Sequence, residues 1–319
     1  MAVYTPVSAE EIAALLARYE GTTPLVSAKG IAEGVENSNY LVDTEDHRYI
    51  LTLYEKRVDK ADLPFFLALI DHLADRGLPV PRALRDRDGV QIQEVAGRSA
   101  CLIEFLPGVS LSHPTVPQAR AAATIMGEMH RALEDFPLER PNSLGADAWA
   151  PLLARCGHDL DAIRPGLYDR LSRALDAVLP LWDRAAPRSV IHADLFPDNV
   201  LTLGDRVTGI IDFYFACSDV RLYDLAVMHG SWCFDAKGEH YDSAIGEALL
   251  QGYAAGFGLA DGDRTALPVL AMGGCIRFAL TRAWDWLNTP ADALVVRKDP
   301  LAYVRRLDHY AQHGTALFR

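Results

Sequence analysis

Four polar side chains in the middle of the chain are the residues whose types and spacing are best suited to chemistry. His192, Asp194 and Asn199 stand in one short stretch, and Asp212 follows an apolar run. Two carboxylates and an amide near strand ends can hold Mg²⁺ against triphosphate oxygens while one group orients a hydroxyl. The pattern therefore indicates metal-assisted phosphoryl transfer. The alternative is a satisfied turn in which Asp194 only caps a helix.

The hairpin after this stretch favours the catalytic interpretation. Residues 200–203 and 206–212 predict two strands around a Gly-Asp turn. Asp212 then ends the second strand, and we expect its carboxylate to lie near that of Asp194. A third acid, Asp224, stands at the start of a predicted helix.

The elements that must position these residues form a β-rich first part and a helical remainder. Apolar and alternating runs predict strands at 25–29, 40–42, 49–54, 83–85, 90–95 and 99–106, with helices at 8–19 and 63–76. The Asp88-Gly89 turn predicts a hairpin between the fourth and fifth strands. Helical periodicity then predicts helices at 117–134, 146–162, 166–186, 222–234, 241–257, 262–287 and 299–313. We therefore predict an α+β fold, with residues 1–106 as a small antiparallel β-rich lobe, residues 107–319 as a larger helical lobe, and a cleft between them.

Composition narrows the class of partner. The chain has 319 residues and a net charge of −12, which argues against nucleic acid or an anionic membrane as the main partner. The first residues resemble no secretory signal, and the longest apolar stretch, 267–276, is too short to span a bilayer. Five dispersed cysteines indicate reduced thiols in the cytoplasm. Residues 264–319 carry eight Lys and Arg against four Asp and Glu, so this segment alone is basic.

Residues 192–226 carry a family resemblance. The pattern H-x-D-x-x-x-x-N, then I-D-F, then D-L-A resembles the aminoglycoside-phosphotransferase-like or choline-kinase-like superfamily, distant relatives of the protein kinases. The resemblance implies a protein-kinase-like fold that uses ATP and Mg²⁺. It implies that Asp194 accepts or orients the acceptor's hydroxyl proton, that Asn199 and Asp212 hold the metal, and that Asp224 braces the catalytic loop. His192 is then an orienting residue.

The resemblance also implies a nucleotide site in the first lobe. The segment 30–40 resembles a phosphate loop, with Gly30, Asn37, Ser38 and Asn39 as its candidate contacts. Read alone, a two-glycine loop of this kind is more often a simple turn. The segment Glu104–Gly108 resembles the hinge that receives adenine, which makes Glu104 and Leu106 candidates, although a strand ending in a Pro-Gly turn explains this segment equally well.

This chain departs from the superfamily pattern at the third strand, where a cation is usual. Superfamily members usually place Lys or Arg there, whereas this chain has Thr52, which we count as a candidate nucleotide contact. Lys29, Arg48 or Lys56 could supply the missing charge, or backbone and metal contacts could suffice.

Two segments are similar to one branch of the superfamily, the bacterial homoserine kinases. These segments are residues 51–55 and residues 211–224. The similarity implies L-homoserine as the acceptor and a step of threonine synthesis. Homoserine is a zwitterion, so its pocket needs a cation for the carboxylate. Tyr214, Arg277 and Arg282 are the candidate substrate contacts, and a surface or structural role is about as probable for each arginine.

Other functions remain open on the sequence alone. A kinase of the same fold could act on choline, ethanolamine, hydroxylysine or an aminoglycoside. A nucleotide-binding regulator without turnover is a second alternative, which the complete set of Asp194, Asn199 and Asp212 argues against. A serine hydrolase is remote because the chain has no G-x-S-x-G motif. The expected partners are ATP and a small molecule, and the chain is expected to be a monomer or a homodimer.

Overall fold

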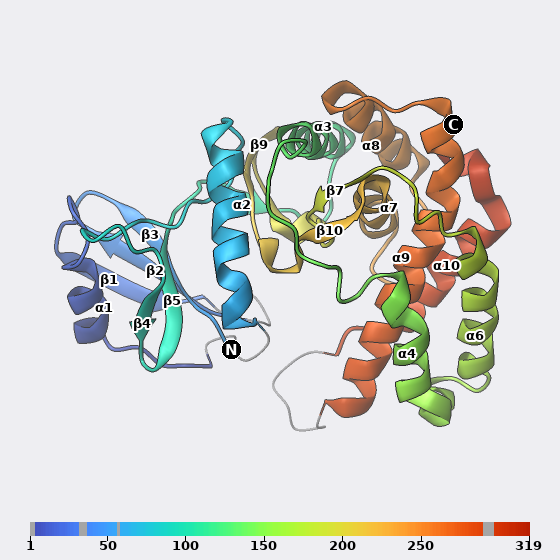
Figure 1. Cartoon of the computed structure of the whole chain (residues 1–319), viewed down its shortest axis with the longest axis horizontal. Helices are drawn as coiled ribbons and strands as arrows, with labels where there is room; N and C mark the ends of the chain where they lie inside the picture. Colours follow the sequence, from blue (N-terminus) through green and yellow to red (C-terminus); the bar gives the residue numbers. More distant parts are fainter. Residues whose placement is uncertain (1–3, 32–36, 56–57, 290–296) are drawn as a thin grey trace. The chain divides into compact units, whose positions relative to one another are not determined.

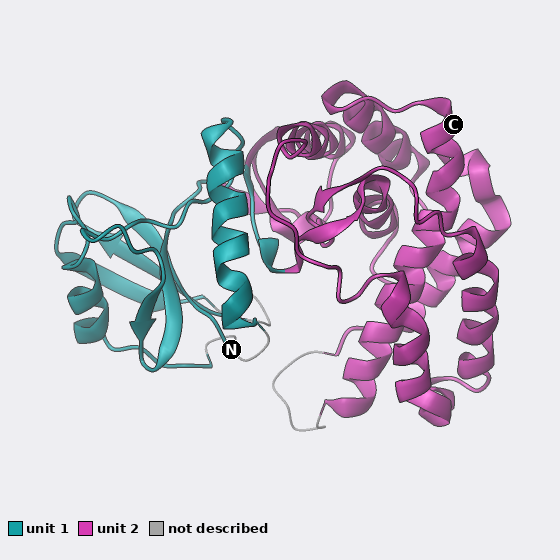
Figure 2. Cartoon of the chain, viewed as in Figure 1, with its two compact units in different colours: residues 1–107, 209–214 teal, residues 108–208, 215–319 magenta. Residues whose placement is uncertain are grey.

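A computed structural model describes residues 4–31, 37–55, 58–289 and 297–319. The chain forms two compact units (Figure 2). Unit 1 comprises residues 1–107 and 209–214, and unit 2 comprises residues 108–208 and 215–319. Unit 1 is therefore built from two separate segments of the chain. The predicted functional division after residue 106 stays a prediction.

Unit 1 is organised around one antiparallel sheet (Figure 1). Its strands lie in the order β1-β2-β3-β5-β4. Their bounds are β1 Leu25–Gly30, β2 Ser38–Thr44, β3 Arg48–Leu53, β4 Gln93–Val95 and β5 Arg98–Glu104. In β2 buried side chains alternate with half-buried ones, because successive residues of a strand point to opposite faces. The β-rich first part predicted from the sequence is confirmed.

Helix α1 (Ala9–Leu16) covers one part of this sheet. A capping box is present at its start: Ser8 accepts a hydrogen bond from the backbone N–H of Glu11, and the Glu11 carboxylate accepts one from the backbone N–H of Ser8. Ile12 and Leu15 of the helix then join Val42 and Leu51 of the sheet in a buried apolar cluster. Helix α2 (Leu63–Asp75) also belongs to unit 1.

The predicted hairpin at Asp88-Gly89 is wrong. Residues 83–85 form only an isolated bridge, from Ala83 to Ile103, and the hairpin of this region joins β4 to β5. It turns at Ala96 and Gly97, whose φ values are 48° and 72°, the left-handed conformation of a tight hairpin turn. The Asp88-Gly89 turn instead wraps around the buried carboxylate of Asp86, which accepts hydrogen bonds from the backbone N–H groups of Asp88 and Val90. A local turn signal cannot reveal which strands pair across it.

Unit 2 is mainly helical, as predicted. Its helices are α3 Val116–Ala132, α4 Ala146–Cys156, α5 Leu160–Ile163, α6 Leu167–Val178, α7 Arg221–Trp232, α8 Ser243–Gly256, α9 Asp261–Asn288 and α10 Leu301–His313. The predicted helix at 146–162 is interrupted at Gly157, where φ is 55°, and the one at 166–186 ends early in a 3₁₀ turn at Leu179–Leu181.

Short strands between residues 109 and 220 frame the stretch that holds His192, Asp194 and Asn199. They are β6 Val109–Ser110, β7 Arg188–Ile191, β8 Val200–Leu203, β9 Arg206–Ile210 and β10 Cys217–Val220. The predicted β8–β9 hairpin is present, with β6 on the other side of β8. β7 pairs with β10, which places Ile191 opposite Cys217.

The long helix α9 is a core element of unit 2. By length and composition it is the one helix in the described part of the chain that could cross a membrane. In its apolar 18-residue window 72% of the window is buried inside the protein, as in the central helix of a folded domain. It packs against α4, α7 and α10 (Figure 1).

Helices α3 and α8 approach each other closely because glycines line their contact (Figure 1). A Cβ atom at Gly252 would overlap the carbonyl oxygen of Arg120, and one at Gly256 would overlap that of Thr124. On the facing helix, a Cβ atom at Gly127 would lie 2.7 Å from the backbone nitrogen of Phe257. The two backbones therefore touch where any other residue would force them apart.

Gly252→Ala should therefore destabilise the protein. The added methyl overlaps the carbonyl group of Arg120 and lies 3.0 Å from the Cβ atom of Ala123 on the facing helix. Overpacking of this kind costs about 1–3 kcal/mol, or roughly 2–5 °C in melting temperature for a chain of this length. Differential scanning calorimetry measures the change. The matched control is Gly262→Ala in the first turn of α9, where a Cβ atom meets nothing within 4 Å. An unchanged melting temperature for Gly252→Ala would contradict the close contact.

Candidate active site

Hydrogen bonds to the backbone of Asp194 hold the loop between β7 and β8 in a compact conformation. The carbonyl oxygen of Asp194 accepts hydrogen bonds from the side-chain Nδ2 of Asn199, at 2.8 Å, and from the backbone N–H of Phe196, at 2.8 Å. The Nδ1 atom of His192 accepts from the backbone N–H of Asp194 at 3.3 Å. Ala193 has a φ of 63°, which is uncommon for a residue other than glycine and marks a sharp reversal of the chain. The structure thus brings His192, Asp194 and Asn199 together.

A buried carboxylate accepts hydrogen bonds from the backbone of this loop. Asp224, in the first turn of α7, is fully buried and accepts the backbone N–H of His192 at 2.8 Å and that of Ala193 at 2.7 Å. Burial alone would raise the pKa of Asp224, but hydrogen bonding to His130 and the two backbone donors outweighs it, so the pKa is lowered. Asp224 is therefore a charged acceptor that fixes the backbone on which Asp194 stands.

Two residues that the sequence analysis did not find complete this network. His130 of α3 is fully buried, with Nε2 3.1 Å from Asp224 and Nδ1 2.9 Å from the hydroxyl of Tyr253 in α8. Because an ionised carboxylate only accepts hydrogen bonds, Nε2 of His130 carries the proton in this arrangement. A histidine among apolar helix positions gives no signal of such a role in a single sequence.

Two cations act on Asp194 within unit 2. Burial raises the pKa of Asp194, and the charges of Arg277 and Lys298 oppose that rise. Arg277 is 2% exposed, and its guanidinium donates a 2.5 Å hydrogen bond to the carbonyl of Ala193. Its predicted contact with the substrate stays a prediction, and the bond that the structure shows is to the loop itself.

Asp212 and Tyr214 belong to unit 1, whereas Asp194 and Asn199 belong to unit 2. Asp212 follows β9 with a φ of 66°. The ring of Tyr214 packs edge-on against those of Tyr54, at 5.4 Å between centroids, and Phe66, at 5.7 Å. Burial raises the pKa of Tyr214, whose hydroxyl donates a 3.3 Å hydrogen bond to that of Tyr54. Its contact with a substrate stays a prediction.

The candidate phosphate-binding residues include one linked pair. The hydroxyl of Thr52 donates a 2.7 Å hydrogen bond to Oδ1 of Asn39, which lies opposite it in the β2–β3 pair. Ser38 donates to the Glu55 carboxylate at 2.7 Å, and Asn37 accepts from the backbone N–H of Glu55 at 3.3 Å. Asn37, Ser38 and Thr52 are buried, and Asn39 is half-buried. Thr52 is therefore part of a fixed polar cluster at one end of the sheet.

Only part of the predicted phosphate loop, residues 30–40, belongs to the residues that the structure describes. Gly30 ends β1 opposite Tyr40. Residues 32–36, five of the eleven residues of the predicted phosphate loop, lie outside the described residues, as does Lys56. Of the other cations weighed for the phosphates, Arg48 pairs with Asp43 at 2.6 Å and Lys29 is exposed on β1.

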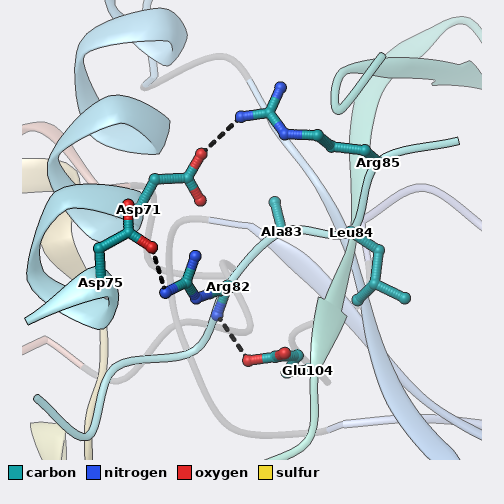
Figure 3. Close-up of a pocket in the computed structure, with 7 residues that line it drawn as sticks. All are labelled: Asp71, Asp75, Arg82, Ala83, Leu84, Arg85 and Glu104. Atoms are coloured by element: carbon teal, nitrogen blue, oxygen red, sulfur yellow. Dashed lines mark hydrogen bonds and ion pairs between the residues drawn. The ribbon is translucent and has the colours of Figure 1, made fainter. Parts of the chain in front are cut away.

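Glu104 ends β5 beside a hollow of about 370 Å³ in unit 1. Figure 3 shows its carboxylate turned toward the backbone N–H of Arg82, 3.3 Å away. Two ion pairs line this hollow: Arg82 pairs with Asp75 at 2.6 Å, and Arg85 pairs with Asp71 at 2.7 Å. Leu106, two residues beyond the strand, is half-buried. Nucleotide contacts at Glu104 and Leu106 stay predictions.

Solved structures of several kinases share this fold. A spectinomycin phosphotransferase, solved with ADP and spectinomycin, has a TM-score of 0.74 at 16% identity, and the match covers 98% of this chain and 99% of that one. A microcompartment-associated aminopropanol kinase has a TM-score of 0.67 at 18% identity, with the same coverage. At these identities the likeness shows the fold alone. The α+β, protein-kinase-like class predicted from the sequence is confirmed.

Sequence comparison is more specific. The profile described as "Phosphotransferase enzyme family" matches residues 27–267. A homoserine kinase of Zymomonas mobilis is 51% identical over 313 residues, 98% of each chain. A homoserine kinase of Acidiphilium cryptum is 50% identical over 316 residues, 99% of this chain and 98% of that one. The chain belongs to the phosphotransferase enzyme family.

Asp224→Asn should loosen the loop and destabilise unit 2. The amide has one acceptor oxygen in place of two and presents an N–H₂ group to a buried donor, which costs roughly 2–5 kcal/mol. Thermal unfolding measures the loss. Asp242→Asn is the control, because Asp242 is an exposed N-cap of α8 and asparagine caps equally well.

The pH dependence of this loss tests its cause. Because the folded-state pKa of Asp224 lies below 3.8, its stabilisation is present above that value and is lost as pH falls through the folded pKa. The difference between wild type and variant should therefore persist between pH 5 and 8 and narrow only below about pH 4. A difference that disappears near pH 6 would point to another group.

Proposed function

We propose that this chain is an ATP- and Mg²⁺-dependent kinase that phosphorylates the side-chain hydroxyl of L-homoserine to O-phospho-L-homoserine, a step of threonine synthesis. The observation that carries the proposal is 51% identity to a homoserine kinase over 98% of both chains. Membership of the phosphotransferase family supports the reaction class. The dispersed cysteines, all free and buried in this structure, support a cytoplasmic setting.

In this proposal Asp194 orients the acceptor hydroxyl and accepts its proton. The transition state of phosphoryl transfer is loose, so alignment of the hydroxyl and neutralisation of charge supply most of the rate. Alignment requires a rigid loop, which the bonds from His192 and Ala193 to Asp224 and from Arg277 to Ala193 provide. His192 is a positioning residue whose ring accepts from the backbone of Asp194.

Asn199 and Asp212 are the proposed metal ligands. Both offer oxygen atoms, the donors that Mg²⁺ prefers. Since Nδ2 of Asn199 is committed to the Asp194 carbonyl, its Oδ1 is the side-chain atom that can face a cation. Bound Mg²⁺ would neutralise the charge of the triphosphate oxygens.

The nucleotide is assigned to residues 1–106, and catalysis and acceptor binding to residues 107–319. Gly30, the cluster of Asn37 to Asn39 with Thr52, and the backbone at Glu104 and Leu106 are the proposed nucleotide contacts. Thr52 stands where related kinases usually have a cation, and it already bonds to Asn39. Backbone N–H groups and the metal then neutralise most of the phosphate charge.

Acceptor preference tests the proposal directly. Purified protein with MgATP is assayed by coupled ADP release against L-homoserine, choline, ethanolamine, 5-hydroxylysine and an aminoglycoside, with the product identified by mass spectrometry. We expect kcat/KM for L-homoserine to exceed the others by at least about 10²-fold, because a site built for charged groups rejects acceptors that lack them. A better alternative acceptor would replace homoserine in the proposal. Nucleotide binding without transfer to any acceptor would make the chain a regulator.

Asp194→Asn should lower kcat by roughly 10²–10⁴-fold while the Kd for ATP changes little, because only the proton acceptor is lost. Steady-state kinetics and calorimetric titration with ATP measure the two effects. Asp205→Asn in the exposed β8–β9 turn is the control. The carboxylate must be ionised to act, and burial raises its pKa, so wild-type kcat should fall with decreasing pH at a higher pH than for an ordinary aspartate. Loss of ATP binding with turnover retained would contradict the assignment.

A further inference from the structure

Arg282 of α9 is a half-buried cation that has no acidic partner among the residues that the structure describes. Its guanidinium donates a long hydrogen bond, 3.4 Å, to the backbone carbonyl of Asp299. Among the residues that the structure describes, no carboxylate oxygen lies within 4.0 Å of it; the carboxylate of Asp299 pairs instead with Arg305 at 2.9 Å. Burial lowers the pKa of Arg282, which reflects the cost of removing this charge from water. An anion bound at this guanidinium would offset that cost.

The surroundings hold Arg282 in one orientation. Its guanidinium lies 4.5 Å from the ring centre of Tyr303, a residue of α10 that is 1% exposed. The guanidinium of Arg306 lies 4.3 Å from the same ring centre, and Phe278 stacks on the ring at 4.9 Å. Arg306 is in turn fixed by a 2.8 Å hydrogen bond to the carbonyl of Asp235. A rigid aromatic support of this kind leaves the planar guanidinium organised for a carboxylate before any ligand binds.

This cation lies on the side of unit 2 that holds Asp194. The ring of Phe278, which stacks on that of Tyr303, also packs against the ring of Phe196 at 5.1 Å between centroids, and Phe196 is two residues beyond Asp194. Lys298 is exposed, and its ammonium lies 5.9 Å from the ring centre of Phe196. The loop that carries the proposed hydroxyl-orienting carboxylate is therefore linked to Arg282 through stacked rings and has the charge of Lys298 close to it. A cationic acceptor such as choline gains nothing from that charge, whereas a zwitterion with a carboxylate does.

We propose that Arg282, supported by Tyr303, binds the carboxylate of the acceptor, with Lys298 as a second cation, so that the enzyme selects amino alcohols that carry a carboxylate. The inference rests on the proposed function in taking Asp194 as the point where the hydroxyl reacts. The inference gives two arginines of one helix different roles. Arg282 contacts the acceptor, whereas Arg277, which is buried and donates to the carbonyl of Ala193, positions the loop.

The test compares two acceptors that differ only in the carboxylate, L-homoserine and 3-amino-1-propanol. Arg282→Met keeps the apolar stem and removes the charge. We expect the ratio of kcat/KM for L-homoserine to that for 3-amino-1-propanol to fall by roughly 10–10³-fold, mostly through KM of L-homoserine, because a charge-assisted pair is lost. Arg282→Lys, which keeps the charge without the planar fork, should fall between wild type and Arg282→Met.

Two further variants show whether the change in ratio is specific. Arg297→Met is the matched control, since Arg297 also lies over an aromatic ring, that of Trp286 at 5.8 Å, and donates a 3.3 Å bond to a backbone carbonyl. It should leave the ratio unchanged. Arg277→Lys should lower kcat with both acceptors and also leave the ratio unchanged. Thermal unfolding of each variant confirms that it is folded.

Each outcome separates this inference from the proposed function. If Arg282→Met lowers kcat/KM equally for both acceptors, Arg282 is a structural residue and the inference fails while the homoserine kinase proposal stands. If 5-hydroxylysine or another amino acid proves the better acceptor and Arg282→Met selectively impairs it, the homoserine proposal fails and the carboxylate site stands. If wild type prefers the acceptor without a carboxylate, or transfers phosphate to neither, both fail.

Discussion

The arrangement of unit 2 depends on one buried carboxylate, that of Asp224. The chain reverses at Ala193, which turns the N–H groups of His192 and Ala193 inward, where water cannot satisfy them. An ionised acid accepts both, and His130 stabilises its charge in turn. Strand β7, helix α7 and helix α3 thus meet at a single side chain, which is why this loop can present Asp194 in a fixed position.

The glycine contact between α3 and α8 serves the same network. His130 lies on α3 and Tyr253 on α8, and their side chains meet at 2.9 Å. The same two helices are held together by the close backbone contact at Gly252 and Gly256. The helix pair that carries His130 and Tyr253 is therefore a fixed support for the hydrogen bonds that hold the loop. Two cations of α9 are likewise held by their surroundings in a chain of net charge −12: Arg277 by the carbonyl of Ala193 and Arg282 by the ring of Tyr303.

Much of this was predictable because it is encoded locally. The α+β class, the β8–β9 hairpin and the capping box before α1 come from periodicity, a turn signal and a spacing of three residues. What sequence could not provide depends on pairing at a distance. The hairpin at Ala96 and Gly97 was missed because Ala96 carries no turn signal. His130 was missed because nothing in a single sequence links residues 130 and 224. The distinct contacts of Arg277 and Arg282 also required coordinates, since both look alike as basic residues on one helix.

The inclusion of residues 209–214 in unit 1 bears on how the protein is made. Ile210 donates a 2.8 Å hydrogen bond to the carbonyl of Pro79, so the second segment is bonded to the first. During synthesis the chain emerges from its N-terminus, and domains generally fold as they become complete. The β-rich unit cannot be complete until the ribosome has passed residue 214, when about half of the helical unit has already been translated. The two units must therefore mature together, and a ribosome that stalls after residue 107 leaves a nascent chain without its final piece.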